Sequence, residues 1–384
     1  MIPEDWVVAR IDEYYDVISS KRVLQRDWKS RGVPFYRARE VAVLAEKGVV
    51  DNELFITEDL YLTLKSKYGV PKVGDALVTG IGTIGKVYTV SPDNMFYFKD
   101  ASVLWLKSRG GYSSEFLKQV FLTDIIVKQI KNSSMGTTVE TYTIQSAKKT
   151  LVPTPSLEEQ RAIATALSDV DALITALDKL IAKKRAIKTA AMQQLLTGKT
   201  RLPGFSGEWE TKRLGDIAHI QTGSKNNQDK VEGGQYPFFV RSETVERIDS
   251  YSYACEAILV PGEGGIGSIF HYINGRFDVH QRVYAITQFA SNVSGKFVYL
   301  YMTNHFGAHA MRNTVKATVD SLRLPAFQSF EIRMPPTLDE QTAIAQVLSD
   351  MDAEIAALEA RRDKTRAIKQ GMMQQVLTGR VRLV

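Results

Sequence analysis

Apolar side chains recur at alternating intervals of four and three residues in two long stretches of this 384-residue chain. In the first stretch they occupy Ile163, Leu167, Val170, Ile174, Leu177 and Ile181. In the second they occupy Ile344, Leu348, Met351, Ile355 and Leu358, after which Arg362 stands where the spacing requires an apolar residue. A 4-3 spacing predicts long helices that pack along a coiled-coil seam, and Arg362 indicates that the two seams are not perfectly symmetric.

The two stretches are copies of one segment. Residues 157–202 align with 338–383 at an offset of 181 (338 − 157), and 27 of the 46 aligned pairs are identical. Capping boxes at Ser156–Glu159 and Thr337–Glu340 mark the helix starts, and Gly198 and Gly379 mark the ends. About 40 residues give each helix a length of roughly 60 Å. Matched seams predict that the helices pack on each other in antiparallel, with a pseudo-two-fold axis relating the halves of the chain.

The segments that precede the two helices also resemble each other, although weakly. Trp6–Ile11 corresponds to Trp209–Leu214 at an offset of 203, and Gly80–Gly85 (GIGTIG) parallels Gly262–Gly267 (GEGGIG). Both segments contain β-branched and aromatic runs separated by Gly, Pro, Asn and Asp, which predicts mixed α/β domains with strand-rich cores. We therefore expect an α+β fold in which two globular domains are joined by two long helices. The expected division is a first domain at 1–155, a helix at 156–198, a second domain with a short linker at 199–336, and a helix with a C-terminal tail at 337–384.

Composition narrows the class of protein only a little. Hydrophobic residues make up 44% of the chain and charged residues 24%, which is typical of a soluble globular protein. The single cysteine, Cys255, excludes an internal disulfide and a Cys-rich zinc site. The opening residues lack the layout of a signal peptide, and no run approaches the ~20 apolar residues of a membrane span, so we expect a cytoplasmic protein with no membrane contact. The net charge is +6, and residues 1–205 contain 29 Lys/Arg against 23 Asp/Glu, which mildly favours a polyanionic partner.

Motifs for chemistry are weak. Gly80–Val87 fits G-x-G-x-x-G and misses a P-loop only where Val87 replaces Ser or Thr. Both phosphate-binding motifs need a following helix, whereas Lys86–Val90 has the pattern of a strand, so we expect a tight glycine turn between two strands. The five histidines have no metal-binding spacing; His305 and His309 lie four residues apart without the intervening Glu of HExxH. We therefore expect no cofactor, no metal and no catalytic centre.

At this point the chain resembles the specificity subunits of type I restriction–modification systems. The resemblance covers nearly the whole sequence, and its most specific marks are the helix starts PSLEEQ and PTLDEQ, the helix ends QQLLTG and QQVLTG, the paired glycine loops and FDVHQRVY at 277–284. It implies two target-recognition domains that each read one half of a split, asymmetric site in double-stranded DNA. It also implies that the helices form an antiparallel spacer, that two methyltransferase subunits dock there, and that restriction motor-nuclease subunits join them. The subunit itself is then not an enzyme.

Polar and basic residues in loops are the candidates for DNA contact, because phosphate contacts position a protein and base-edge contacts specify sequence. In the first domain they are Ser20, Lys21, Arg22, Arg37, Arg39, Thr79, Lys86, Ser134 and Thr137. In the second they are Ser224, Lys225, Asn226, Arg241, Ser242, Glu263, Ser268, Arg312, Asn313 and Lys316. Each could instead be a solvated surface side chain, and His280, Gln281 and Arg282 could form a buried network or contact bases. Glu263 could accept from a cytosine amine or be an ordinary loop charge.

Two further interpretations stay open at this stage. Gln193, Gln194, Gln374 and Gln375, beside the exposed-looking Met192, Met372 and Met373, could belong to a docking surface or could simply cap the coiled coil. The chain could also be an orphan or decoy scaffold that binds methyltransferase without reading DNA, or a nucleotide-dependent enzyme that uses the Gly80–Lys86 loop. Abolishing DNA binding distinguishes a DNA-recognition subunit from the scaffold, because a pure scaffold loses nothing. A test for ATP binding distinguishes the nucleotide-dependent enzyme.

Overall fold

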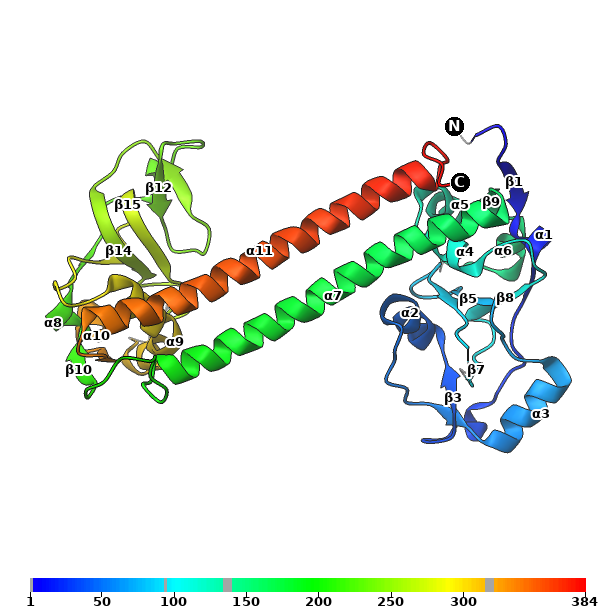
Figure 1. Cartoon of the computed structure of the whole chain (residues 1–384), viewed down its shortest axis with the longest axis horizontal. Helices are drawn as coiled ribbons and strands as arrows, with labels where there is room; N and C mark the ends of the chain where they lie inside the picture. Colours follow the sequence, from blue (N-terminus) through cyan, green and yellow to red (C-terminus); the bar gives the residue numbers. More distant parts are fainter. Residues whose placement is uncertain (1–2, 93–94, 134–139, 315–320) are drawn as a thin grey trace. The chain divides into compact units, whose positions relative to one another are not determined.

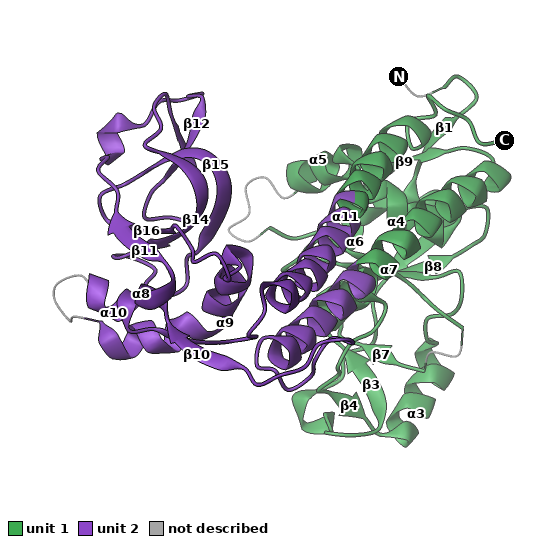
Figure 2. Ribbon diagram, turned by 60° about the vertical axis from the view of Figure 1, so that its left-hand side comes forward, with its two compact units in different colours: residues 1–177, 361–384 green, residues 178–360 purple. Residues whose placement is uncertain are grey.

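In the computed structural model, which describes residues 3–92, 95–133, 140–314 and 321–384, the two longest elements are helices of 39 residues. They are α7 (Leu157–Leu195) and α11 (Leu338–Val376) (Figure 1). The chain divides into two compact units: unit 1 comprises residues 1–177 and 361–384, and unit 2 comprises residues 178–360 (Figure 2). Each unit therefore combines a globular part with the first turns of one long helix and the last turns of the other.

The long helices share a hydrophobic core with the globular part of each unit. In unit 1, Ile163 and Leu167 near the start of α7 pack in one cluster with Val376 and Leu377 at the end of α11. In unit 2, Ile344 and Leu348 of α11 pack in one cluster with Leu195 and Leu196 after α7. Positions that are equivalent in the repeat, 181 residues apart, therefore make the same core contacts in the two units. Of the predicted seam, Ile163, Leu167, Leu177, Ile181, Ile344, Leu348 and Ile355 are buried, and Val170, Ile174, Met351 and Leu358 are half-buried.

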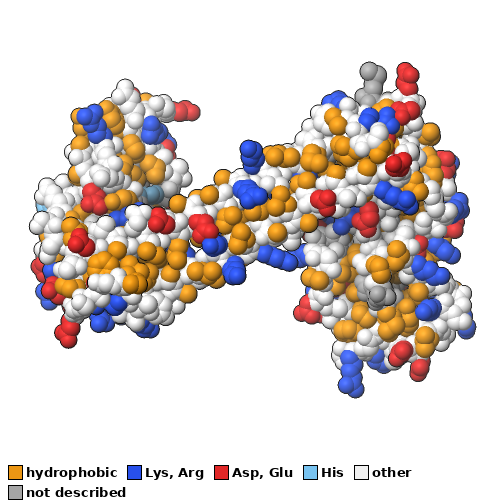
Figure 3. All heavy atoms as spheres, viewed as in Figure 1, with side chains coloured by type: hydrophobic (Ala, Val, Ile, Leu, Met, Phe, Trp, Pro, Cys, Tyr) orange, Lys and Arg blue, Asp and Glu red, His pale blue; other side chains and the backbone are white. Residues whose placement is uncertain are grey.

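Ion pairs show that the helix segments run in opposite directions within a unit. In unit 2, Lys184 and Lys188 of α7 contact Glu354 at 2.7 Å and Asp352 at 2.5 Å, so the α11 numbers fall as the α7 numbers rise. In unit 1, Lys369 contacts Asp171 at 2.7 Å. The pairs Asp171–Lys369 and Lys188–Asp352 are equivalent positions of the repeat (171 + 181 = 352; 188 + 181 = 369). The predicted antiparallel packing is therefore confirmed inside each unit. On the face shown in Figure 3, charged and hydrophobic side chains intermingle along the helices.

The described residues of unit 1 form three small sheets. A four-stranded antiparallel sheet has the order β2-β8-β5-β6, a three-stranded sheet has the order β4-β3-β7, and β1 pairs with β9. The strands are β1 (Val7–Arg10), β2 (Tyr15–Ile18), β3 (Val33–Tyr36), β4 (Phe55–Ile56), β5 (Ala76–Thr79), β6 (Val87–Thr89), β7 (Tyr97–Phe98), β8 (Val103–Ser108) and β9 (Leu151–Thr154). The helices are α1 (Ile11–Tyr14), α2 (Ala38–Lys47), α3 (Glu58–Tyr68), α4 (Ser114–Val120), α5 (Asp124–Ser133) and α6 (Ile144–Lys149).

Unit 2 joins the equivalent strands into one sheet. Its order is β11-β16-β14-β15-β12-β13, and β10 pairs with β17. The strands are β10 (Glu210–Arg213), β11 (His219–Thr222), β12 (Tyr236–Phe239), β13 (Glu246–Ile248), β14 (Tyr253–Pro261), β15 (His271–Val279), β16 (Val283–Thr287) and β17 (Glu331–Met334). The helices are α8 (Leu214–Ile217), α9 (Gly295–Asn313) and α10 (Leu324–Gln328). The nine-residue strand β15 takes the place of β6 and β7, which are separated in unit 1 by a segment containing Pro92, a residue that cannot donate to a strand ladder. The predicted α+β class is confirmed.

The two predicted capping boxes are only half correct. Ser156 Oγ accepts from Glu159 N at 3.2 Å, and Thr337 Oγ1 accepts from Glu340 N at 3.4 Å, as the motif requires. The carboxylates, however, turn away from the helix starts. Glu159 binds Arg382 at 2.5 and 2.7 Å, and Glu340 binds Arg201 at 2.5 and 2.6 Å. The long-range partners prevail because both carboxylates are buried, and a buried carboxylate needs a cation to offset its desolvation.

Among the helices that the structure describes, none combines the length and the apolar character that crossing a membrane would require.

Candidate functional site

A glycine loop stands at the same place in each unit and is held by equivalent backbone hydrogen bonds. In unit 1, Gly80 N donates to Ser102 O at 2.9 Å, and Gly80 O accepts from Tyr142 N at 2.8 Å. In unit 2, Gly262 N donates to Arg282 O at 2.9 Å, and Gly262 O accepts from Leu322 N at 2.8 Å. The loop in unit 1 joins the antiparallel strands β5 and β6, so the predicted glycine turn between two strands is confirmed.

Only glycine fits at the first position of these loops. A Cβ atom at Gly80 would lie 2.7 Å from Tyr142 O, and a Cβ atom at Gly262 would lie 2.9 Å from the ring of Tyr284. Real Cβ atoms essentially never approach other heavy atoms so closely, so the backbone at Tyr142 or the ring of Tyr284 would have to move. The close packing fixes each loop on its sheet. Side chains carried by the loops and the adjoining strands are therefore presented from a rigid support, as a recognition site requires.

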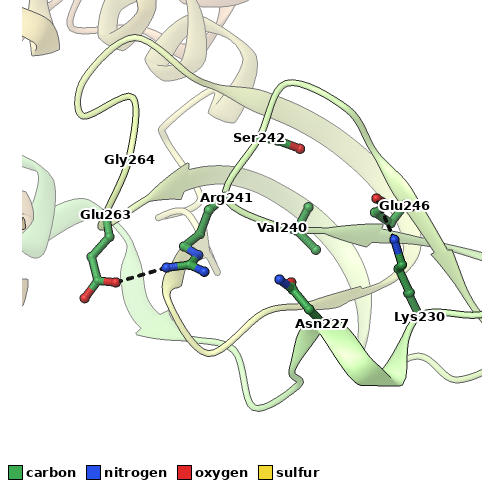
Figure 4. Close-up of a pocket in the computed structure, with 8 residues that line it drawn as sticks. All are labelled: Asn227, Lys230, Val240, Arg241, Ser242, Glu246, Glu263 and Gly264. Carbon is green, nitrogen blue, oxygen red and sulfur yellow. Dashed lines mark hydrogen bonds and ion pairs between the residues drawn. The ribbon is translucent and has the colours of Figure 1, made fainter. Parts of the chain in front are cut away.

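In unit 2 the loop carries a carboxylate that lies between two arginines. Glu263 Oε2 is 3.3 Å from Arg241 Nη1, and Glu263 Oε1 is 3.4 Å from Arg282 Nη1. The side chain of Glu263 is 23% exposed, whereas those of Arg241 and Arg282 are 42% and 51% exposed. Beside this pair is a surface pocket of about 410 Å³ (Figure 4). Its lining comprises Asn227, Lys230, Val240, Arg241, Ser242, Glu246, Glu263 and Gly264.

His280 lies beneath the arginines and is almost fully buried. Its backbone N–H donates to Phe239 O at 2.9 Å, and its Nδ1 accepts from Arg282 N at 3.0 Å. Burial lowers the pKa of His280, and the positive charges of Arg241 and Arg282 lower it further. The neutral ring is therefore favoured, in keeping with Nδ1 as an acceptor. His280 belongs to the buried network of the site, and Arg282 reaches the surface from the same segment.

Lys225 and Asn226 join the same site from the segment after β11. Lys225 N donates to Val279 O at 3.2 Å, and Gln281 N donates back to Lys225 O at 2.8 Å. The Lys225 ammonium is 3.9 Å from the buried carboxylate of Asp278, and the amide of Gln281 donates to Asn226. The structure thus brings together Lys225, Asn226, Arg241, Ser242 and Glu263 of the predicted contacts.

Asn227 and Lys230 were not predicted, although they line the pocket. Asn227 begins a 3-10 turn that ends at Asp229, and Lys230 follows it; the Asp229 carboxylate accepts from Asn226 N and caps the start of the turn, and both Asn227 and Lys230 line the pocket with Arg241. The spacing of Asn226 and Asp229 is the sequence signal that could have indicated this turn.

In unit 1 the predicted cations are paired in a different way. Arg37 is held by Glu40, with Nε at 3.0 Å and Nη2 at 2.7 Å, and Nη2 also contacts Glu53 at 3.2 Å. Burial alone would raise the pKa of Glu40, but the hydrogen bonds from Arg37 outweigh it and hold that pKa below its ordinary value. Arg39 shares Glu53 at 3.3 Å. Arg37 and Arg39 are therefore engaged within the fold.

The other cationic candidates of unit 1 contact single partners. Lys21 is exposed and stands 5.5 Å from the centre of the Tyr68 ring, while Arg22 is 68% exposed and contacts Asp100 at 2.8 Å. Lys86 is paired with Glu46 at 2.5 Å. Ser20 Oγ donates to Phe98 O at 2.7 Å, which fixes the segment that carries Lys21 and Arg22.

The remaining candidates have varied positions. Thr79 is fully buried, and its hydroxyl accepts from Lys86 N at 3.0 Å, so its side chain serves the glycine loop and is not available to a ligand. Ser224 and Ser268 are exposed, as are Arg312 and Asn313 at the end of α9. The predicted contacts Ser134, Thr137 and Lys316 lie outside the described residues.

The ends of the long helices differ from the sequence-based expectation. Met192, Met372 and Met373 are half-buried against the cores of their units and are not exposed side chains. The glutamines that follow them are exposed. In unit 1 the end of α11 also borders a small pocket of about 230 Å³. It is lined by Leu122, Thr123, Asp124, Ile125, Gln370, Met373, Gln374 and Thr378.

Histidines do not form a metal site in the part of the chain that the structure describes, where no three His, Cys, Asp or Glu side chains gather as ligands. His309 Nε2 hydrogen-bonds Ala326 O at 2.8 Å, and the ring of His305 packs on Tyr301.

Comparisons with known proteins agree on one family. The model of the type I restriction modification DNA specificity domain matches residues 3–188 and again residues 206–366. The putative type I restriction enzyme MjaX specificity subunit of Methanocaldococcus jannaschii is 23% identical over 424 aligned positions, which cover 100% of this chain and 95% of that protein. The EcoDI specificity subunit of Escherichia coli is 29% identical over 171 residues, which cover 44% of this chain and 37% of that protein. The crystal structure of the type I restriction–modification S subunit from M. genitalium has a TM-score of 0.66 at 16% identity and covers 98% of this chain and 96% of its own.

Proposed function

Because this chain belongs to the type I restriction–modification DNA specificity family, we propose that it recognises DNA on behalf of methyltransferase and restriction subunits and catalyses no reaction itself. One observation carries the proposal. Each unit carries cationic side chains on segments that hydrogen bonds fix in place: Lys21 and Arg22 follow Ser20, whose hydroxyl donates to Phe98 O, and Lys225 is bonded through its backbone to Val279 and Gln281. Figure 3 shows Lys and Arg side chains on the surface of both units. Rigidly held cations suit a ligand made of evenly spaced phosphates.

The proposed DNA site has two different halves. Unit 1 offers Lys21, Arg22 and Lys86, whereas unit 2 offers Lys225, Arg241 and Glu263. Base-edge contacts depend on which side chains reach the groove, so different side chains select different sequences. The full proposed contact set is Ser20, Lys21, Arg22, Lys86, Ser224, Lys225, Asn226, Arg241, Ser242, Glu263, Ser268, Arg312 and Asn313.

The long helices are the proposed spacer. Thirty-nine residues at about 1.5 Å each give a rod of roughly 58 Å, and helices joined along a buried seam bend little. The half-sites of symmetric DNA readers lie about one helical turn, or ~34 Å, apart, which such a rod can accommodate. The division into domains at 1–155 and 199–336 with helices at 156–198 and 337–384 is part of this proposal. Two methyltransferase subunits would dock along the helices, with restriction motor-nuclease subunits joining them in the cytoplasm.

Methylation protection tests the proposal. The full-length chain is mixed with the methyltransferase encoded beside its gene, and the treated DNA is then sequenced for modified bases. We expect one motif with two specified parts separated by unspecified positions, and binding that weakens steeply with salt as phosphate contacts are screened.

A variant that combines Lys21→Gln, Lys86→Gln and Lys225→Gln separates a DNA reader from a scaffold. A reader loses DNA affinity, while its affinity for methyltransferase is unchanged. A chain that binds methyltransferase but produces no methylated motif, with or without these substitutions, would contradict DNA recognition and leave a scaffold.

A further inference from the structure

The arginines that follow the equivalent strands β3 and β12 are bonded in opposite ways. Both strands pair in parallel with a neighbour, β3 with β7 and β12 with β15. Arg37 directly follows β3, and Arg241 is the second residue after β12. In unit 1, Arg37 directs Nε and Nη2 at a single buried carboxylate, Glu40, which occupies the forked edge of the guanidinium. That edge is the one which matches two acceptors side by side.

In unit 2, Arg241 directs only Nη1 at Glu263, and Arg282 directs only its own Nη1 at the other oxygen of the same carboxylate. Within the described residues, neither guanidinium makes another ion pair or hydrogen bond. Nε and Nη2 of both arginines are therefore available, and both side chains are more than two-fifths exposed. Both forked donor edges are thus without a partner among the described residues, while one carboxylate contacts the Nη1 atoms of both arginines.

The carboxylate is placed to orient the arginines. Glu263 stands on the loop that Gly262 fixes by hydrogen bonds to Arg282 O and Leu322 N, so the loop and one of the arginines are tied to each other through the backbone as well. A flexible arginine loses rotamer freedom when it binds, and prior positioning by a carboxylate reduces that loss. The buried ring of His280 accepts from Arg282 N and so fixes the same segment from below.

We propose that Arg241 and Arg282 read guanine in the half-site bound by unit 2, and that Glu263 is the residue that positions them. The acceptors O6 and N7 on the major-groove edge of guanine match a guanidinium fork, and this is the commonest specific contact between proteins and DNA. A phosphate would also accept from an arginine, but an anionic Glu263 beside it would oppose phosphate binding through like-charge repulsion. In unit 1 the fork of Arg37 is occupied by Glu40, so guanine reading by this pair is confined to one half-site.

This inference rests on the proposed DNA recognition, and the test separates the two. The full-length chain selects binding sites from a library of random duplexes, and the base preference at each position is measured for the wild type and for three variants. Arg241→Lys keeps the charge and removes the fork. Glu263→Gln removes the charge that holds both arginines. Lys230→Gln is the matched control, because Lys230 lines the same pocket and pairs with an exposed carboxylate at 3.4 Å.

We expect Arg241→Lys to reduce the preference for guanine at one position of one half-site by roughly 5- to 150-fold, the loss of one bidentate pair. Glu263→Gln weakens guanine preference in that same half-site and leaves the other half-site unchanged. Lys230→Gln lowers affinity for all sequences to a similar degree and leaves base preferences unaltered.

Two outcomes would overturn the inference while leaving DNA recognition standing. One is a bipartite motif whose guanine preference is the same in Arg241→Lys as in the wild type. The other is an equal loss of affinity for every sequence, which would assign the arginines to phosphate. A wild-type chain that selects no motif at all would overturn the proposed function itself. Melting temperatures within about 4 °C of wild type are expected, because these partly exposed ion pairs contribute only about 0–1 kcal/mol, and they show that the changes are not due to unfolding.

Discussion

Replacing Arg201 by Met removes the cation that is paired with the buried Glu340 carboxylate in unit 2. Arg201 lies just after α7, and its guanidinium binds Glu340 at the start of α11 at 2.5 and 2.6 Å. It also donates to Gly207 O at 2.6 Å and Ser206 O at 3.0 Å, so it holds the segment that leads into the second globular part. Methionine preserves most of the apolar stem but none of these bonds. The substitution therefore isolates the polar interaction.

The magnitude follows from the burial of Glu340. Its side chain is only 1% exposed, and removing one partner of a buried ion pair costs about 3–5 kcal/mol because the other charge stays desolvated. We take about 3 kcal/mol, the lower end, because the side chain of Arg201 is itself 25% exposed and water can partly replace it. For a unit of 183 residues (360 − 178 + 1), this corresponds to a fall of roughly 6–12 °C in melting temperature.

The repeat supplies a matched comparison in Arg382→Met. Glu159, the equivalent of Glu340, keeps a hydrogen bond from Trp6 Nε1 at 3.2 Å when Arg382 is removed. The equivalent indole, Trp209 Nε1, is buried without a hydrogen-bond partner among the described residues. We therefore expect Arg201→Met to lower the melting temperature more than Arg382→Met does.

Scanning calorimetry of the wild type, the single variants Arg201→Met, Arg382→Met and Glu340→Gln, and the double variant Arg201→Met with Glu340→Gln measures these effects. The double variant should be more stable than Arg201→Met alone, because it leaves no buried unpaired charge. The reasoning is refuted if Arg201→Met lowers the melting temperature by less than about 2 °C. It is equally refuted if the two substitutions in the double variant add independently.

Three further predictions concern single positions. Gly371→Ala should stabilise the chain by about 0.5–1 kcal/mol, measured by urea unfolding, because Gly371 is in α11 with open space around it and the equivalent position of α7 is Ala190. Gly262→Ala should destabilise it by about 1–3 kcal/mol in the same assay, because the new methyl group meets the Tyr284 ring at 2.9 Å; equal stability would show that the loop is pliant. The lowered pKa of His280 gives a stability contribution that is present above pH 6.5 and lost as the pH falls through the folded-state pKa. The melting temperature should therefore drop less between about pH 7.5 and about pH 5.5 in His280→Asn than in the wild type, and an identical drop would contradict that role.

The long helices and the glycine turns could be predicted from the sequence because their signals are local. The 4-3 spacing defines a helix face, and the 181-residue repeat indicates where the partner face lies. The direction taken by Glu159 and Glu340 could not be predicted in this way. Their partners stand 223 and 139 residues away, so the local S-x-x-E and T-x-x-E patterns favoured a capping box that tertiary contacts override.

The order of the strands in the sheets could not be predicted from the sequence, because it also depends on tertiary contacts. Short alternating runs indicate strands but not their neighbours, and the difference between three small sheets in unit 1 and one six-stranded sheet in unit 2 depends on whether one segment is interrupted. Pro92 is a local signal of that interruption, yet its consequence becomes visible only when the strands are paired.

Polar loop residues could be identified from the sequence as candidates for DNA contact. Whether each side chain is available to DNA depends on its hydrogen bonds and ion pairs within the protein, which the sequence does not show. Arg37 and Arg241 follow equivalent strands, and the sequence contained a signal for the difference in their bonding: Arg37 is followed three residues later by Glu40 at the start of α2, whereas Arg241 has no acid at that spacing. Thr79 was predicted to contact DNA as a polar loop residue and is buried, because a residue at the end of a strand can point inward as readily as outward. Burial at such positions follows from strand register, which the sequence leaves open.

Methylome sequencing of cells with and without the intact gene tests the central claim most directly. The account predicts one methylated motif that depends on the gene and has two different specified halves separated by a fixed number of unspecified positions. An unchanged methylome in the presence of an active partner methyltransferase would contradict DNA recognition by this chain.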